Sequence, residues 1–194
     1  MALGDAPLWS RSNAGDVDAF AKLFERHGRT IYNYCFRRTG EWAAAEDLVS
    51  IVFLEAWRRR DTELPEDKVL PWLFGVANNV VRNHRRAQRR YAAVLLRVPE
   101  SPSPGFEAEA DLDDERQIKP ILEVISRLPK HEQDVFTLAA WFELSYEDIS
   151  VALGLPVGTV RSRLSRARQR LRKLDSGLGL EGVVATNTQE ALEP

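Results

Sequence analysis

The chain has 194 residues, a formal net charge of −2, 44% hydrophobic residues and 29% charged residues, which are ordinary values for a globular protein with its own core. Its one cysteine, Cys35, excludes an internal disulfide framework and suits a reducing compartment. The N-terminus lacks a basic stretch followed by an apolar run, and no window approaches about 18 uncharged apolar residues. We therefore expect a cytoplasmic protein with no membrane insertion.

The first half of the chain predicts three amphipathic helices. Apolar residues recur every three or four positions over residues 20–35, and Gly40 closes this pattern. A second apolar stripe covers residues 45–57, and a third follows Pro71, a residue type that often opens a helix. No run alternates with the period of a β-strand, so the sequence predicts an all-α fold.

The polar side of the third predicted helix combines amide and arginine side chains. Amides can pair with the edges of accessible bases while arginines hold phosphates. Trp57 and Trp72 could stack on unpaired bases, although core packing is the favoured interpretation for both. The alternative for the whole face is an ordinary polar helix surface. The residues of this candidate face are Asn78, Asn79, Arg82, Asn83, Arg86 and Arg89.

An acidic segment separates the two halves of the chain. Residues 99–115 (PESPSPGFEAEADLDDE) contain seven acids, three prolines and no basic residue, which is typical of a linker. We expect two small helical domains joined by this linker. The expected boundaries are 1–10 for a flexible N-terminus, 11–97 for the first domain, 98–116 for the linker, 117–175 for the second domain and 176–194 for a disordered tail.

The second half predicts four short helices. Ser145 with Asp148 three residues later resembles a capping box, Gly154 suits a helix end, and Pro156 can open the last helix. Two helices joined by a tight turn, with an arginine-rich second helix, are typical of a helix-turn-helix. The expected helices cover Gln117–Arg127, Pro129–Phe142, Ser145–Leu153 and Pro156–Leu174.

The last predicted helix presents arginines that no acid in the same helix compensates. The stretch PVGTVRSRLSRARQR, residues 156–170, contains five arginines and no acid. An apolar stripe from Val160 to Leu174 turns these arginines toward solvent, where like charges repel one another. A polyanion would relieve the repulsion and release its counterions on binding. DNA is the expected ligand, and a solvated arginine-rich face is the alternative.

Three motifs follow one another along the chain, namely AEDLVSIVFLEAWRR (45–59), PWLFGVANNVVRNHRRAQRR (71–90) and LSYEDISVALGLPVGTVRSRLSRARQRLRK (144–173). Motifs of this kind in this order resemble the extracytoplasmic-function (ECF) sigma factors of bacterial RNA polymerase. The resemblance covers roughly residues 10–174 and implies an initiation factor that directs core RNA polymerase to promoter DNA. It implies a partner surface for the clamp helices of the largest polymerase subunit, another for the flap of the second-largest subunit, and a possible anti-sigma factor. No cofactor or metal is implied.

The resemblance also implies residue roles. The first domain would recognise and melt the minus-ten element through Asn78, Asn79, Arg82, Asn83, Arg86 and Arg89, with Asn79 contacting a non-template base. The loop 61–69 would capture a flipped base. The second domain would recognise the minus-thirty-five duplex through Thr159, Arg161, Ser162, Arg163, Ser165 and Arg166. Polymerase would contact Asp47, Ser50, Glu55 and Arg58. The acidic linker would either thread toward the RNA exit path or act as a solvated tether.

The chain departs from the family pattern at three places. Ser50-Ile51 stands where Gln-Glu is common, so fewer polar groups face polymerase there. Glu143 stands where glycine is frequent, so we expect that helix end to be capped differently. The tail 176–194 extends beyond the usual end, and we expect it to be disordered rather than regulatory.

Three other functions compete with the sigma factor interpretation. The three histidines are scattered and no catalytic motif occurs, so an enzyme is the least supported. A stand-alone helix-turn-helix regulator would bind duplex DNA without polymerase. An interaction module that only docks on polymerase would tolerate Arg161→Ala or Arg166→Ala.

Overall fold

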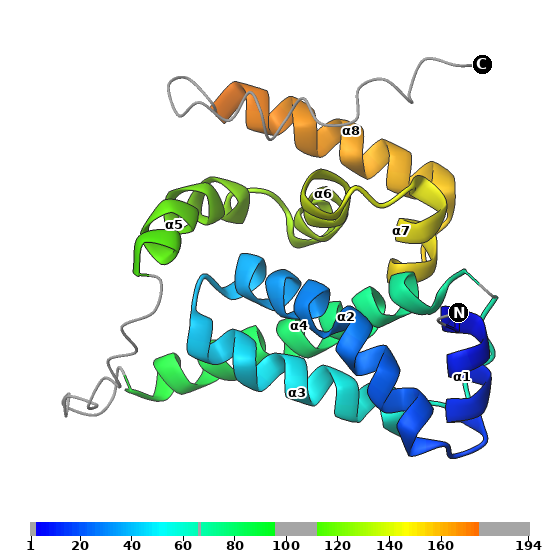
Figure 1. The fold of residues 1–194 in the computed structure, drawn as a ribbon. Helices are drawn as coiled ribbons and strands as arrows, with labels where there is room; N and C mark the ends of the chain where they lie inside the picture. Colours follow the sequence, from blue (N-terminus) through cyan, green and yellow to red (C-terminus); the bar gives the residue numbers. More distant parts are fainter. Residues whose placement is uncertain (1–2, 66, 96–111, 175–194) are drawn as a thin grey trace.

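The computed structural model describes residues 3–65, 67–95 and 112–174, and every regular element in these ranges is an α-helix. Figure 1 shows α1–α4 as one layer and α5–α8 as a second layer above it. The all-α prediction with two helical domains is confirmed. In chain order the helices are α1 (Asp5–Asn13), α2 (Val17–Thr39), α3 (Trp42–Arg58), α4 (Val69–Leu95), α5 (Leu112–Ser126), α6 (Lys130–Phe142), α7 (Tyr146–Leu153) and α8 (Val157–Leu174).

Local sequence signals set the ends of α2, the longest helix whose two caps are both described. The Asp16 carboxylate accepts a hydrogen bond from the backbone N–H of Ala19 at 2.9 Å, which caps the N-terminus. Gly40 ends the helix in the left-handed conformation, with φ of 75°, as the sequence predicted from a glycine at this position. The buried face of α2, which includes Leu23 and Ile31, packs against α3 and α4.

The prediction of a flexible N-terminus over residues 1–10 is wrong from Asp5 onward, because α1 is a folded part of the first domain. Residues 1 and 2 lie outside the described residues. Leu8 and Trp9 are buried, and the indole N–H of Trp9 donates to the carbonyl of Thr62 at 3.0 Å. A carboxylate oxygen of Asp5 lies 2.7 Å from Nε2 of His27 on α2. Fewer than three helical turns carry these contacts, so the sequence shows too little periodicity to reveal them.

The second domain follows its predicted elements closely. Helices α6, α7 and α8 each begin one residue after the predicted start and end where predicted. The Ser145 hydroxyl accepts the N–H of Asp148 at 3.1 Å, and Gly154 ends α7 with φ of 63°. Helix α5 begins at Leu112, inside the predicted linker 98–116, and the rest of that linker up to residue 111 lies outside the described residues.

Sequence analysis predicted that the end of α6 would be capped differently from the family pattern, because Glu143 replaces a frequent glycine. The structure shows that this prediction is wrong. Glu143 itself takes the left-handed conformation, with φ of 51°, although a side chain is strained there. The N–H of Leu144 then closes onto the carbonyl of Leu138 at 3.3 Å, which satisfies a free carbonyl of the last turn. The backbone geometry is therefore the one that glycine supplies, adopted by a glutamate.

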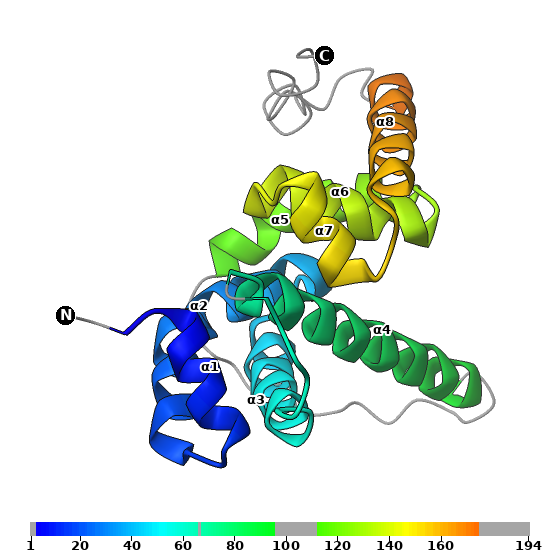
Figure 2. The same cartoon turned by 90° about the vertical axis from the view of Figure 1, so that its right-hand side faces the viewer.

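The two domains pack against each other through an aromatic cluster. Phe142 of α6 lies between Tyr34 of α2 and Phe74 of α4, with ring centroids 5.6 and 5.0 Å away. Arg37 lies over the ring of Trp141 at 5.1 Å. In Figure 2 the C-terminal parts of α4 and α8 both extend away from the place where the domains meet. This contact decides which parts of each domain face solvent.

Candidate nucleic-acid interface

The outer face of α8 carries the arginines predicted to bind duplex DNA. Val160, Leu164, Ala167 and Leu171 are buried against the second domain, which turns the opposite side of the helix outward. The exposed residues of that side include Arg161, Ser162, Ser165 and Arg166, whereas Thr159 and Arg163 are half-buried. The structure thus brings the predicted minus-thirty-five residues onto one surface.

A buried glutamate of the neighbouring helix holds part of this surface. Glu132 of α6 is 1% exposed, and its carboxylate lies 3.5 Å from Arg170 and 4.0 Å from Arg166 of α8. Arg161 lies over the ring of Tyr146 at 5.7 Å. These contacts restrict the side-chain freedom of the arginines, so less of it would be lost on binding a ligand. Sequence analysis did not identify Glu132, because the sequence shows no pairing between α6 and α8.

The C-terminal part of α4 carries the second cationic face. Its Val76, Ala77, Val80 and Val81 are buried in the first domain. Five of the six predicted minus-ten residues lie on the exposed side, namely Asn79, Arg82, Asn83, Arg86 and Arg89.

The prediction that Asn78 lies on the exposed face is wrong. Asn78 is 3% exposed, and its side-chain oxygen accepts a hydrogen bond from the hydroxyl of Tyr34 at 3.0 Å. Burial raises the pKa of Tyr34 well above its usual range, so the hydroxyl keeps the proton that it donates. Asn78 therefore supplies the hydrogen-bond acceptor that the buried hydroxyl of Tyr34 requires.

A buried ion pair joins the domains beside this face. A guanidinium nitrogen of Arg38 on α2 lies 2.7 Å from a carboxylate oxygen of Asp134 on α6, and these side chains are only 4% and 6% exposed. Arg82 lies 4.0 Å from the other oxygen. Arg85 donates a hydrogen bond to the carbonyl of Arg38, and burial together with the Arg38 charge lowers the pKa of Arg85 to about 10. Three arginines of the first domain thus gather around one carboxylate of the second.

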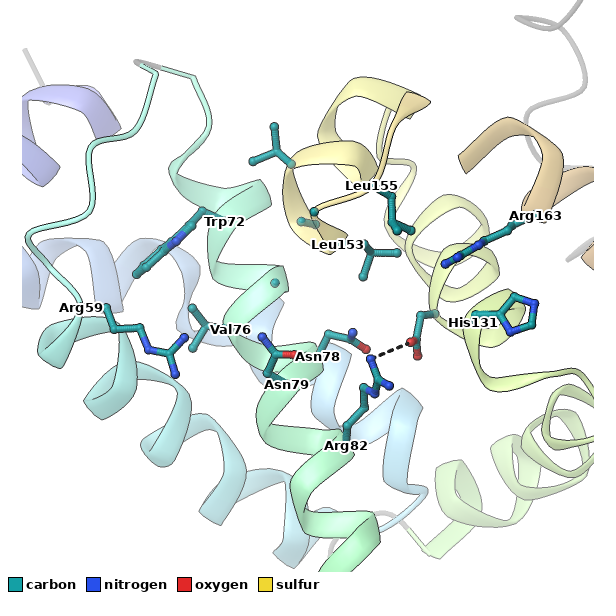
Figure 3. A pocket seen from close by; sticks show the side chains of 15 residues that line it. Arg59, Trp72, Val76, Asn78, Asn79, Arg82, His131, Leu153, Leu155 and Arg163 are labelled. Atoms are coloured by element: carbon teal, nitrogen blue, oxygen red, sulfur yellow. Dashed lines mark ion pairs between the residues drawn. The ribbon is translucent and has the colours of Figure 1, made fainter. Parts of the chain in front are cut away.

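An interdomain cavity of about 380 Å³ opens next to this ion pair. Figure 3 shows Trp72, Asn79 and Arg82 on one side of it. Leu153, Leu155 and Arg163 belong to the other side, on the second domain. The cavity therefore lies between residues predicted for the minus-ten element and residues predicted for the minus-thirty-five element.

The loop predicted to capture a flipped base borders a different hollow. A space of about 540 Å³ is lined by Glu63, Leu64, Pro65 and Val69 of this loop, and by α1 residues that include Trp9. Sequence analysis missed the contribution of α1 to this wall, since it treated residues 1–10 as flexible. Glu66 of the loop lies outside the described residues.

The outer face of α3 combines predicted polymerase contacts with exposed apolar residues. Asp47, Ser50 and Arg58 are exposed, and a carboxylate oxygen of the half-buried Glu55 pairs with Arg58 at 2.8 Å. Ile51 and Leu54 on the same helix are 44% and 50% exposed. Sequence analysis did not assign these two residues, although large apolar side chains in solvent are a signal for a docking surface.

Among the residues that the structure describes, no helix is long and apolar enough to cross a bilayer. Within the same residues, no group of His, Cys, Asp and Glu side chains could hold a metal ion. The tail 176–194 lies outside the described residues.

The chain thus has two helical domains, and each presents a separate cationic face. Comparison with known families matches residues 23–91 to "Sigma-70 region 2" and residues 118–171 to "Sigma-70, region 4". The chain is 30% identical to the RNA polymerase sigma factor CarQ of Myxococcus xanthus, over 88% of this chain and 97% of CarQ. It is also 30% identical to the ECF sigma factor SigW of Bacillus subtilis, over 82% of this chain and 90% of SigW. The chain belongs to the ECF RNA polymerase sigma factors.

Two solved structures share the fold. CnrH, solved in complex with the cytosolic domain of CnrY, has a TM-score of 0.66 and 24% identity, covering 88% of this chain and 96% of CnrH. RpoE of Bartonella quintana, solved with the anti-sigma factor NepR, has a TM-score of 0.60 and 24% identity, covering 80% and 95% of the two chains.

The family gives the biochemical class of the protein. As a sigma factor it binds core RNA polymerase and directs promoter-specific transcription initiation through its region-two and region-four domains. Sigma factors are initiation factors rather than classical enzymes. The match to region two, in addition to region four, also argues against a stand-alone helix-turn-helix regulator.

Proposed function

We propose that region four recognises the minus-thirty-five duplex through the exposed face of α8. Arg161, Ser162, Ser165 and Arg166 lie on that face, with Thr159 and Arg163 at its edge. Arginine in the major groove can bind a guanine edge with two hydrogen bonds, worth ~1–3 kcal/mol of discrimination. Thr159, in the first turn of the helix, is suited to a backbone phosphate.

Region two would hold the melted minus-ten strand along α4. Asn79 and Asn83 supply amide groups for base edges, and Arg82, Arg86 and Arg89 supply cations for phosphates. A preformed pocket lowers the cost of extruding a base, and the hollow between loop 61–69 and α1 is the candidate for it. We assign Asn78 the role of orienting Tyr34 instead of a direct DNA contact.

The outer face of α3 would dock on the clamp helices of the largest polymerase subunit. Ile51 and Leu54 supply an apolar centre, and Asp47, Ser50, Glu55 and Arg58 supply polar groups around it. This composition resembles a protein interface, in which an apolar core has a polar rim. Ser50-Ile51 stands where Gln-Glu is common in the family, so Ile51 takes the place of a polar group. Region four would contact the flap of the second-largest subunit.

We assign residues 11–97 to region two and 117–175 to region four, with α1 as an N-terminal addition to region two.

The protein would act in the cytoplasm, where polymerase meets promoter DNA. An anti-sigma factor is proposed as a further partner, because CnrH and RpoE, which share the fold, were solved with regulators of that kind or with a cytosolic partner domain. The acidic linker would lead toward the RNA exit path.

The observation that carries the residue assignment is the arginine face of α8, a helix described in full that contains no acid. Runoff transcription with purified core polymerase tests it on promoters selected with the wild-type protein. Arg161→Ala with Arg166→Ala should lower promoter-specific product roughly 100-fold, since each arginine contributes a few kcal/mol at most. Arg172→Ala, on an exposed part of the same helix, is the matched control.

The α4 assignment is tested in the same assay. Asn79→Ala should impair open-complex formation while leaving binding to duplex DNA unchanged. Gln88→Ala is the control, because Gln88 is an exposed amide of α4 outside the proposed face. If neither set of variants changes the start sites or the yield, the residue assignment is wrong.

A further inference from the structure

Helix α6 packs against α8 and places a buried acid beside its arginines (Figure 1). Glu132, the third residue of α6, is 1% exposed, and a carboxylate out of water is costly unless cations or hydrogen-bond donors compensate it. One oxygen lies 4.0 Å from Nε of Arg166 and 3.9 Å from Nε2 of His131, and the other lies 3.5 Å from Nη1 of Arg170. Within the described residues this second oxygen, Oε2, has no hydrogen-bond partner. Attraction to the charge of Arg170 therefore compensates it.

The two arginines that face Glu132 lie one turn apart on α8. Arg166 and Arg170 occupy positions i and i+4, where like charges repel each other, and α8 contains no acid to separate them. Glu132 lies close to both guanidinium groups, so α6 supplies the negative charge that α8 lacks. The two arginine side chains remain 53% and 50% exposed. The buried carboxylate thus restrains cations that a ligand can still reach.

Glu132 restrains the two arginines through different atoms. Nε of Arg166 donates to the carbonyl of Ser162 at 3.3 Å and also pairs with Glu132, so its terminal nitrogens can form two hydrogen bonds to a guanine edge. In Arg170 the terminal nitrogen Nη1 itself faces the carboxylate. A phosphate that binds this nitrogen has to draw it away from a buried charge, which then loses its compensation. Glu132 therefore opposes a phosphate contact of Arg170 more than a base contact of Arg166.

We propose that Glu132 is a positioning residue that raises the selectivity of region four for its minus-thirty-five sequence. Its carboxylate keeps Arg170 away from phosphates and orients Arg166 toward a base edge. Phosphate contacts add affinity for every DNA sequence, whereas contacts to base edges distinguish one sequence from another. Withholding a phosphate contact lowers affinity for every duplex, and the oriented Arg166 restores affinity only for the cognate one. The inference rests on the proposed function, since it concerns the α8 face assigned above.

Glu132→Gln tests the proposal, because glutamine keeps the shape of the side chain and removes its charge. Holoenzyme made from core polymerase and the full-length protein is titrated onto promoter fragments that carry either the selected minus-thirty-five sequence or a scrambled one. The released Arg170 should bind a phosphate, which steepens the salt dependence of log Kd by about 0.9 and tightens binding to the scrambled fragment roughly eightfold at about 0.1 M salt. Loss of the Arg166 orientation should lower the ratio of the two Kd values roughly fivefold or more, the low end for one bidentate arginine contact.

Arg170→Gln is a second test at an exposed position. Because Glu132 already withholds Arg170 from DNA, this variant alone should leave the salt dependence of the wild-type protein unchanged. Combined with Glu132→Gln, it should cancel the steeper salt dependence, while the ratio of the two Kd values stays low. Glu147→Gln is the matched control, because it removes one acidic charge from an exposed position on α7 of the same domain. It should change neither the salt dependence nor the ratio.

Two results would overturn the proposal. One is that Glu132→Gln weakens binding to both fragments alike, or leaves the salt dependence and the ratio as in wild type. The first form of this result would show that Glu132 only stabilises the domain. The other is that Arg170→Gln alone lowers the salt dependence by about 0.9, which would show that Arg170 binds a phosphate despite Glu132.

The same titrations separate this inference from the proposed function. Wild-type holoenzyme that does not distinguish the two fragments rejects the assignment of α8 to the minus-thirty-five element. Wild-type discrimination beside an unchanged Glu132→Gln variant rejects only the role of Glu132. Circular dichroism identifies a Glu132→Gln protein that fails to fold, and Arg170→Gln then decides.

Discussion

Glu143 occupies a backbone position that suits glycine better than glutamate. Its φ of 51° strains a residue with a Cβ atom, whereas glycine adopts this conformation without a steric cost. We expect Glu143→Gly to raise the free energy of unfolding by up to about 1 kcal/mol, since relief of strain exceeds the added freedom of the unfolded chain. Urea denaturation measures the change. Glu147→Gly, inside α7, should lower the free energy of unfolding by about 1 kcal/mol.

Cys35 is a buried thiol whose chemistry follows from its surroundings. Burial raises its pKa from 9.0 to about 12, so below pH 9 the folded protein has roughly a thousandfold smaller thiolate fraction than the unfolded chain. Iodoacetamide should therefore modify Cys35 rapidly in urea and very slowly in the native protein. A native rate equal to the unfolded rate would show that the thiol is accessible.

The same thiol affects the pH dependence of stability. The unfolded thiol loses its proton above about pH 9, whereas the folded thiol keeps it up to about pH 12. The unfolded state then binds fewer protons, so the free energy of unfolding should fall as the pH rises through this window. Tyr34, whose pKa is also raised by burial, contributes with the same sign. Cys35→Ala should remove part of the decrease in a urea titration.

At the scale of helices, α1 links the N-terminus to the loop proposed to capture a base. Trp9 donates its indole N–H to Thr62 in that loop and lies 4.8 Å from Trp72 between ring centroids. We expect Trp9→Phe to cost about 1 kcal/mol through the lost hydrogen bond, while the ring stays apolar and aromatic. Promoter melting, followed by permanganate reactivity of unpaired thymines, should weaken, and binding to minus-thirty-five duplex should not change. Equal loss of both would show a general folding defect.

The sequence predicted helix ends more accurately where it contains capping or helix-ending residues. Ser145, Gly154 and Pro156 have local effects on the backbone, so the ends of α7 and α8 followed from them within one residue. Helix α1 has no comparable signal, and its stability comes from tertiary contacts of Leu8 and Trp9. The wrong prediction for Asn78 has the same cause. The sequence does not show that Asn78 accepts a hydrogen bond from the buried Tyr34, so its amide was assigned to the exposed face together with Asn79.

At the scale of the molecule, the contact between the domains was beyond sequence analysis. Arg38 and Asp134 are 96 positions apart, and each looks like an ordinary surface charge of a helix. Both proposed DNA-binding faces could be predicted, because each depends on the period of one helix. Their relative position depends on shape complementarity at Gly75 and Phe142, which no local pattern encodes.

Replacement of the buried Arg38–Asp134 ion pair by apolar residues should not destabilise the protein. Well-packed hydrophobic residues in place of a buried pair are often neutral or stabilising by about 1–4 kcal/mol. We expect Arg38→Met with Asp134→Leu to leave the free energy of unfolding unchanged or to raise it by about 1–4 kcal/mol, as measured by urea denaturation. Arg38→Met alone should lower it by about 3–5 kcal/mol, because the Asp134 charge then stays buried without its closest partner. A double variant that is less stable than Arg38→Met alone would contradict this account.

Lys68 stands where the loop proposed to capture a base joins α4, and it pairs with Asp148 in the first turn of α7, three residues after the N-cap Ser145. Asp67 pairs with the same ammonium group at 2.7 Å, so two carboxylates, one from each domain, hold Lys68 between the loop and α7. A phosphate at this rim would therefore have to displace a carboxylate before the ammonium group could bind it.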